Sequence, residues 1–346
     1  MKVALIGAGQ IARQHLGCLQ TLPGVELAGI CDLSAATAEA AAERYGVRAW
    51  FTDHRAMLEQ ARPDVVHVTT PPTSHFRLAM DALDAGAHII VEKPATATFD
   101  ELETLTRRAQ ETRRQLVEDH NYVFNHAPQE ILCRIASGEF GAVTHVEVLI
   151  CLDILGPSGF ADPNAPHPAL TLAGGAIADF LPHLASLAHA FVGPHRNAHT
   201  VWSKRKRSPL PFDEFRAVVD AERGTAALGF SASSQPDAFW LRVYGEQMQA
   251  TANIFETRLT FDGPRNVPKP LRPFFSGLEE GKTIRRAAVK TLLRKFKGPG
   301  AYEGLWELLT RTYRSLADGT PLPVTGSDVL AVNRLVEALK PREQRP

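Results

Sequence analysis

A lysine that follows a buried apolar run is the first residue whose position suggests chemistry. Lys93 stands in the tripeptide Glu92-Lys93-Pro94, directly after the run Ala87–Val91. We expect this run to be a parallel strand, and parallel sheets bind their ligands at the carboxyl ends of the strands. A lysine ammonium there can polarise a substrate oxygen. The tripeptide therefore favours an enzyme over a protein that only binds a nucleotide.

A second pair of reactive side chains lies in the segment Gly174–His183. Asp179 and His183 are four residues apart, so on a helix they share one face and can flank one ligand. Because proline is tolerated near the start of a helix, Pro182 predicts that both side chains lie in its first turns. The histidine could accept a hydroxyl proton while the carboxylate fixes its tautomer. The alternatives are a capping aspartate with a core histidine, or a zinc pair that lacks further ligands at recognisable spacing.

The glycine-rich turn Gly7-Ala8-Gly9-Gln10-Ile11-Ala12 links a predicted strand, Val3–Ile6, to a predicted helix. The first glycine permits the tight turn, the second lets the backbone approach a pyrophosphate, and the small Ala12 allows close packing of helix on strand. The amino end of the helix adds N–H groups and a partial positive charge. We expect the cofactor to contact Gly7, Gly9, Gln10, Ile11 and Ala12.

An acidic residue supports this nucleotide site. Asp32 ends the second predicted strand about twenty residues past the turn, where a carboxylate can accept a hydrogen bond from a ribose 2′-hydroxyl. The alternative role is a helix cap, which Ser34 could fill instead. Asp32 would repel a 2′-phosphate, and the next residues supply no arginine, so NAD is predicted rather than NADP.

A further wall of the nucleotide crevice is predicted at Thr69–His75, which ends the fourth predicted strand. A rigid turn there suits contacts from Thr70, Pro71 and His75 to a cofactor ribose. We expect Glu92 and Lys93 to contact the cofactor as well. The alternative is a proline-rich strand-to-helix turn whose Thr73 or Ser74 caps the following helix.

The order of predicted elements indicates two domains. Residues 1–120 alternate strand and helix, which implies an α/β Rossmann domain with a covered parallel sheet. Residues 121–340 carry strands without intervening helices, which implies an α+β domain with an open, mostly antiparallel sheet for substrate binding and oligomerisation. A loop rich in proline, glycine and asparagine is expected from Gly156 to Pro168, and residues 341–346 form a frayed tail.

Composition limits the classes of partner. Lys plus Arg and Asp plus Glu number 38 each among 346 residues, so no net charge attracts the chain to nucleic acid or membrane. The four scattered cysteines favour reduced thiols over disulfides or zinc. A signal peptide and a segment long enough to span a bilayer are not recognisable, which predicts a cytoplasmic location.

Five motifs in register resemble the Gfo/Idh/MocA family, the group of glucose–fructose oxidoreductase and inositol dehydrogenase. They are the GAGxIA opening, the acidic end of the second strand, T-P-P-T-S-H, E-K-P and G-G-x-x-x-D-x-x-x-H. The resemblance implies a Rossmann domain, a large open antiparallel sheet, and oxidation of a secondary alcohol of a sugar or cyclitol. It places Lys93 beside nicotinamide and substrate, His183 as proton acceptor, and Asp179 as its partner. It also implies a dimer or tetramer built on the sheet, with Thr225–Ser233 and Phe239–Tyr244 near the contact.

The sequence departs from this family after the sixth predicted strand. His120-Asn121-Tyr122-Val123-Phe124-Asn125 stands where many sugar-acting relatives have an arginine. We therefore expect Asn121 and Tyr122 to line the substrate site, although Tyr122 as a core aromatic is an equal alternative. The substrate of any one relative cannot be transferred.

Two basic segments have open interpretations. Lys204–Arg207 is either a phosphate or nucleotide-sugar site or a solvated loop. Lys282–Lys297 holds seven Lys or Arg and no acidic residue, with an apolar face that includes Ile284, Val289 and Leu292. This predicted helix either packs on the sheet domain or rests on an anionic membrane surface through residues 282–298.

Together the motifs predict an NAD-dependent oxidoreductase that moves hydride between nicotinamide and a carbohydrate-like substrate. Two other functions remain open. One is a glycosidase or lyase in which tightly held NAD cycles through a keto-sugar intermediate. The other is a non-catalytic sensor of NAD or sugar, which would not need Lys93, Asp179 and His183 together.

Overall fold

The computed structural model describes residues 1–156, 159, 161, 170, 172, 174–256, 258–264, 267–297 and 302–341. The expected loop after Gly156 and the tail after Pro341 therefore lie mostly outside the described residues. The chain forms two compact units. Unit 1 is Met1–Asn121 with Gly304–Asn333, and unit 2 is Tyr122–Glu303 with Arg334–Pro346.

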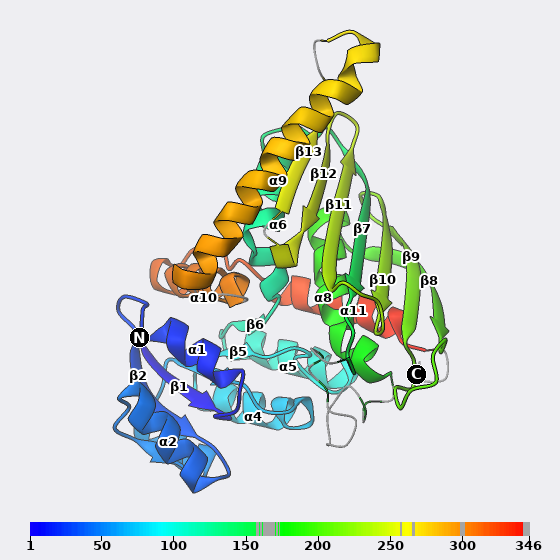
Figure 1. Cartoon of the computed structure of the whole chain (residues 1–346). Coiled ribbons are helices and arrows are strands. Elements are labelled where there is room, and N and C mark those ends of the chain that lie inside the picture. The colour runs from blue at the N-terminus through cyan, green and yellow to red at the C-terminus, as the bar shows by residue number, and fades with distance from the viewer. Residues whose placement is uncertain are drawn as a thin grey trace. The chain divides into compact units, whose positions relative to one another are not determined.

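Unit 1 contains a six-stranded sheet in the order β3-β2-β1-β4-β5-β6, in which every pairing is parallel (Figure 1). The strand order reverses between β1 and β4, the place where such sheets bind nucleotides. The strands are β1 (Lys2–Ile6), β2 (Glu26–Cys31), β3 (Trp50–Phe51), β4 (Val65–Val68), β5 (His88–Val91) and β6 (Leu116–Glu118). The helices are α1 (Ala12–Leu19), α2 (Ala35–Tyr45), α3 (His54–Ala61), α4 (Pro72–Asp84), α5 (Phe99–Glu111) and nearly all of α10 (Glu303–Asp318).

Local sequence explains why these elements begin and end where they do. Strand β4 is buried along its whole length, as its run of valines requires in a sheet covered on both faces. Helix α5 starts with a capping box between Thr98 and Glu101. Helix α2 is capped by Ser34 and ends at Gly46, which has a left-handed backbone. The predicted Rossmann fold of the amino-terminal domain is confirmed.

Unit 2 is built on a seven-stranded sheet in the order β13-β12-β11-β7-β10-β9-β8. Its neighbours are antiparallel except β7 and β10, which run parallel, so the mostly antiparallel prediction is confirmed. Helix α8 packs on β7, β10 and β9. The strands are β7 (Val143–Cys151), β8 (His195–Ser203), β9 (Glu214–Ala221), β10 (Thr225–Ser231), β11 (Ala238–Gly245), β12 (Gln249–Asn253) and β13 (Arg258–Asp262). The helices are η1 (Asn121–Phe124, begun by the last residue of unit 1), α6 (His126–Ala136), α8 (Gly175–Val192), η2 (Ile254–Glu256), η3 (Lys269–Leu271) and α9 (Arg272–Lys297), while α11 (Gly326–Leu339) is shared by both units.

Two features of the structure differ from the sequence expectations. The sequence placed Gly304–Asn333 in the second domain, but the segment groups with unit 1 because its buried side chains, such as Tyr313, pack there. Among the described helices, α8 is long and apolar enough to cross a membrane by length and composition, although none was expected. However, 72% of the α8 residues are buried inside the protein.

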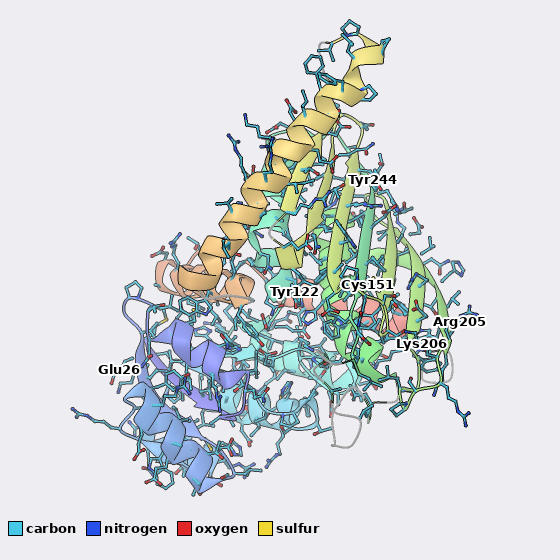
Figure 2. All side chains as sticks on the ribbon, viewed as in Figure 1. Glu26, Tyr122, Cys151, Arg205, Lys206 and Tyr244 are labelled. Atoms are coloured by element: carbon cyan, nitrogen blue, oxygen red, sulfur yellow. The ribbon has the colours of Figure 1, made fainter. Side chains whose placement is uncertain are left out.

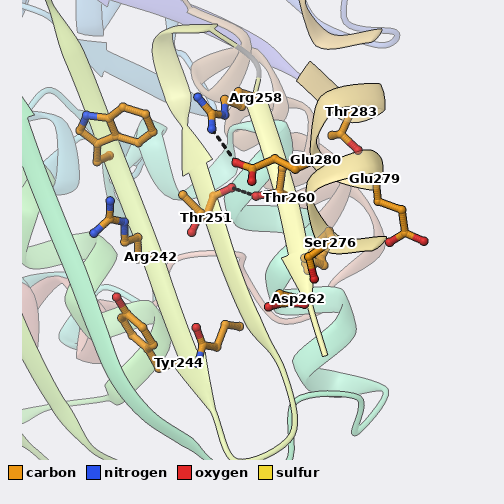
Figure 3. Close-up of a pocket in the computed structure, with 13 residues that line it drawn as sticks. Arg242, Tyr244, Thr251, Arg258, Thr260, Asp262, Ser276, Glu279, Glu280 and Thr283 are labelled. Atoms are coloured by element: carbon orange, nitrogen blue, oxygen red, sulfur yellow. Dashed lines mark hydrogen bonds and ion pairs between the residues drawn. The ribbon is translucent and has the colours of Figure 1, made fainter. Parts of the chain in front are cut away.

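Helix α9 lies along β13, as one of the two alternatives for the basic segment expected, but its apolar face does not meet the sheet (Figure 1). Its polar side chains Glu279, Glu280 and Thr283 line a cavity of about 440 Å³ between the helix and the outer face of β11–β13 (Figure 3). Val289 and Leu292 on the apolar face are instead 60% and 59% exposed. The strands explain this orientation, because they present arginines to the helix and Arg258 pairs with Glu280 at 2.9 Å.

The other basic segment is an exposed turn after β8 (Figure 2). The backbone N–H groups of Arg205 and Lys206 donate to the Asp213 carboxylate at 2.7 and 2.6 Å. The Lys206 ammonium donates to the Ser233 carbonyl at 2.8 Å. This geometry favours the solvated loop over a phosphate site.

Candidate active site

The glycine-rich turn has the shape that a nucleotide site needs. Gly7 has a φ of +96°, and a Cβ there would lie 2.6 Å from Cγ2 of Thr70, so only glycine fits. Among the described residues, no heavy atom lies within 4 Å of the place a Cβ on Gly9 would take. The backbone at Gly9 is thus open to a ligand, and no described side chain caps α1 at Ile11. Ala12 is buried against the core, as predicted.

Asp32 is tied to this turn by both of its carboxylate oxygens. Oδ2 accepts from the N–H of Ala8 at 2.8 Å, and Oδ1 accepts from the N–H of Ser34 at 2.9 Å. Ser34 caps α2 by accepting from the Thr37 N–H at 3.3 Å, so Asp32 is not the cap. Each oxygen keeps lone pairs that can accept from a ribose hydroxyl. The carboxylate therefore both shapes the turn and faces a possible ligand.

The segment after β4 combines an open turn with a structural histidine. Thr70 is half-buried and Pro71 is exposed, so both are available to a ligand. His75 is instead 0% exposed. Its Nε2 lies 2.6 Å from the Thr70 carbonyl oxygen and its Nδ1 lies 2.9 Å from that of Pro94. The imidazole thus braces the β4 and β5 ends against each other, rather than making the cofactor contact predicted for it.

A cluster of charged groups surrounds the end of β5. Burial alone would raise the pKa of Glu92, but the hydrogen bond and charge of His15, the charge of Lys93 and a hydrogen bond from Asp119 hold it below its ordinary value. The pKa of Asp119 is raised well above its ordinary value, by burial and by the charge of Glu92. Asp119 therefore carries the proton and donates to the Glu92 carboxylate. Half-buried Lys93 is next to an anion that the fold keeps ionised.

The second set of predicted residues lies on α8 in unit 2. Asp179 and His183 share one face of this helix, as their spacing requires, and His183 is 6% exposed. The prediction that they lie in the first turns is wrong, because α8 begins at Gly175 and Pro182 lies inside it. The proline leaves the carbonyl of Ala178 without its helical N–H donor, yet the buried helix continues to Val192.

Aromatic rings surround His183. The ring of Tyr122 meets its imidazole edge-on at 4.7 Å between centroids, and the ring of Phe180 lies at 5.7 Å. Tyr122 also contacts Phe239 at 4.8 Å, so it is both a core aromatic and a neighbour of the predicted base. Asn121 is the last residue of unit 1, and its buried Oδ1 has no hydrogen-bond partner among the described residues. Such an oxygen is a candidate ligand contact.

The structure thus groups the predicted residues in two sets. Unit 1 brings together the glycine turn, Asp32, Thr70, Glu92 and Lys93, and unit 2 brings together Tyr122, Asp179 and His183. Sequence reasoning missed Asp119, His15, His67 and Tyr313. One available signal was His67, a polar residue in the middle of the valine strand β4. Within the described part of the chain, no group of three or more His, Cys, Asp or Glu side chains could hold a metal ion.

Comparison with known proteins agrees with the geometry of unit 1. Residues 1–120 match the model of the GFO_IDH_MocA oxidoreductase family, described as an NAD-binding Rossmann fold. The amino-terminal domain is thus similar to the Rossmann domain of this family. The chain is 33% identical over 144 residues to D-glucoside 3-dehydrogenase of Escherichia coli strain K12, a stretch that covers 41% of each protein.

Two further comparisons concern a curated relative and a solved structure. The chain is 28% identical over 156 residues to glycosyl hydrolase family 109 protein 2 of Akkermansia muciniphila, which covers 42% of this chain and 33% of that protein. The chain thus matches less than half the length of these curated relatives. An oxidoreductase of Agrobacterium radiobacter, solved with NAD+, L-tartaric acid and magnesium, has a TM-score of 0.80 and 18% identity. That alignment covers 98% of this chain and 94% of the other, and it shows that both units share the fold.

Proposed function

We propose that this protein is an NAD(H)-dependent oxidoreductase that acts on a secondary hydroxyl or ketone of a sugar, cyclitol or sugar derivative. The observation that carries the proposal is Asp32, whose carboxylate is fixed by the backbone of the glycine turn that it faces. The open backbone at Gly9 and the uncapped start of α1, among the described residues, fit a pyrophosphate. NAD, when bound, would supply the hydride acceptor or donor.

The other predicted site residues transfer the proton, stabilise the developing charge and contact the substrate. In alcohol oxidation, His183 accepts the hydroxyl proton and Asp179, on the same helix face, orients the imidazole. Lys93 stabilises the negative charge that develops on the substrate oxygen. For ketone reduction the same groups act in reverse, so His183 returns the proton. Asn121 and Tyr122 contact the substrate.

The proposed preference for NAD over NADP also rests on Asp32. A carboxylate attracts a ribose diol but repels a 2′-phosphate. The side chain after it, Leu33, is 96% exposed and apolar, so it offers a phosphate no positive charge.

A substrate screen tests the proposal. Purified protein would be incubated with NAD and a panel of sugars, cyclitols, polyols and nucleotide sugars, and NADH would be followed by absorbance. We expect NADH to accumulate with at least one carbohydrate-like alcohol. Binding of NAD in calorimetry without turnover of any panel member, in either direction, would count against the enzyme and favour a sensor.

The family 109 relative supports a second candidate, glycosidic cleavage through a keto-sugar intermediate. In that reaction hydride leaves the sugar and returns to it, so no net NADH forms. The distinguishing result is release of the aglycone from an aryl glycoside with catalytic NAD and constant absorbance of the cofactor.

A further inference from the structure

Four buried side chains form a continuous hydrogen-bonded chain inside unit 1. Tyr313 Oη lies 2.8 Å from His67 Nε2, His67 Nδ1 lies 2.8 Å from His15 Nδ1, and His15 Nε2 lies 2.9 Å from Glu92 Oε1. His15 and His67 are 0% exposed. The chain joins α10, β4 and α1 to the end of β5. It stops at the residue next to Lys93, which the proposed function gives a role at the reacting oxygen.

The charge of Glu92 fixes the direction of the last hydrogen bond in this chain. Glu92 is a carboxylate and must accept, so His15 donates from Nε2. His67 contacts His15 through Nδ1 and Tyr313 through Nε2. Burial, with the charge of His15, holds the pKa of His67 well below its ordinary value, and burial raises the pKa of Tyr313 well above its own. His67 therefore stays neutral and Tyr313 keeps its proton.

We propose that His15, His67 and Tyr313 are positioning residues that hold Glu92 ionised beside Lys93, so that its carboxylate is the counter-charge of the Lys93 ammonium in the proposed dehydrogenase reaction. Glu92 is only 7% exposed, and a carboxylate removed from water tends to take up a proton unless donors replace the lost solvent. His15 supplies one donor and Asp119 the other. Without them Lys93 would lose its adjacent negative charge. The inference rests on the proposed function only for the role of Lys93.

A purely structural network would satisfy the same buried polar atoms, so the test needs a readout that stability does not change. Glu92→Gln keeps the shape and an oxygen for His15 but removes the charge. Tyr313→Phe removes only the hydroxyl at the far end. Tyr45→Phe is the matched control, because its hydroxyl donates to the Arg13 carbonyl of the same unit at 3.2 Å, outside the chain.

The first readout is the pH profile of kcat for alcohol oxidation. An ammonium that has lost a neighbouring negative charge gives up its proton at lower pH. In Glu92→Gln we therefore expect the alkaline limb to move down by about one pH unit. Tyr313→Phe should move the limb in the same direction by less, and Tyr45→Phe should leave it in place. Profiles of Glu92→Gln and wild type that coincide would overturn the proposal, even if both chain variants melt at lower temperature.

The second readout needs no turnover, so it separates this inference from the proposed function. Reductive methylation with ¹³C-formaldehyde makes the lysines visible by NMR, and Lys93→Met assigns the Lys93 signal. We expect that signal to titrate at lower pH in Glu92→Gln than in wild type. Imidazole ¹⁵N shifts should also show a proton on Nε2 of His15 and a neutral ring for His67 near neutral pH. An unmoved Lys93 titration, or a His67 ring that is protonated near neutral pH, would overturn the proposal whether or not a substrate is found.

Discussion

Lys93 in unit 1 and His183 in unit 2 differ in the chemistry of their neighbours. Lys93 adjoins an ionised Glu92 that is held by His15 and Asp119, so its surroundings are charged and hydrogen-bonded. His183 lies among the rings of Tyr122 and Phe180, which carry no formal charge. The first environment keeps the Glu92 carboxylate charged. The second surrounds an imidazole that must gain and lose a proton. Substitutions in the two units should therefore leave different kinetic signatures.

Removing the charge at the end of β5 should have the largest effect. Lys93→Met keeps the length of the side chain but cannot stabilise a developing alkoxide, so we expect kcat/KM to fall by about two orders of magnitude or more. NAD binding, measured by calorimetry, should be preserved. Lys2→Met, at an exposed lysine of the same unit, is the control. A Lys93→Met enzyme within a few-fold of wild type would place the ammonium away from the reacting oxygen.

Removing the imidazole on α8 should change the shape of the pH profile as well as its height. A base must be neutral, so oxidation should become faster as pH rises through the ionisation of His183. His183→Ala should abolish that acidic limb and lower the maximal rate by about two orders of magnitude. His189→Ala, on the same helix, should retain the limb. Survival of the limb in His183→Ala would show that another group is the base.

Substitution of Asp32 should have a smaller effect than the two substitutions above, and the effect should be on the preference for NAD over NADP. Asp32→Ala removes the repulsion of a 2′-phosphate, so the ratio of the Kd for NADP to the Kd for NAD should fall by about tenfold. The variant also loses the hydrogen bonds to Ala8 and Ser34, so both cofactors should bind more weakly and only the ratio is diagnostic. Calorimetry of wild type and variant gives the ratio, and equal affinities in the wild type would refute this role of Asp32.

The parts of the molecule that were predictable depend on local signals. Continuous apolar runs such as Val65–Val68 identify covered parallel strands, and the glycine turn identifies the nucleotide site from backbone constraints alone. The chain from His15 to Tyr313 was not predictable in this way. Its members come from separate elements, and 246 residues separate His67 from Tyr313. Only the folded sheet brings them into contact.

Two errors in unit 2 have a common physical cause, the packing of neighbouring elements. Pro182 signals the start of a helix, but burial of α8 against β7, β10 and β9 extends the helix on both sides of it. The apolar face of α9 predicts packing on the sheet. The sheet, however, presents Arg242 and Arg258 there, which favours the acidic side of the helix (Figure 3). The composition of one segment cannot reveal the surface that it meets.

The smallest effect on activity is expected from the outer face of the second sheet. Val201 and Val218 are 62% and 60% exposed on β8 and β9, and they line an apolar groove of about 450 Å³. Because α9 already lies over β13, we expect a second copy of the chain to contact the β7, β10, β9 and β8 side. Of the two expected contact segments, Thr225–Ser233 would then lie nearer the partner than Phe239–Tyr244.

Charge substitutions test this contact directly. Val218→Arg should convert a dimer or tetramer into a monomer in light scattering, with kcat/KM within about twofold because Val218 is on neither α8 nor β5. Val289→Arg, on the exposed face of α9, is the matched comparison, and we expect it to leave the assembly intact. Dissociation by Val289→Arg instead would move the contact to α9. A wild-type species near 37.8 kDa at micromolar concentration would contradict an oligomer altogether.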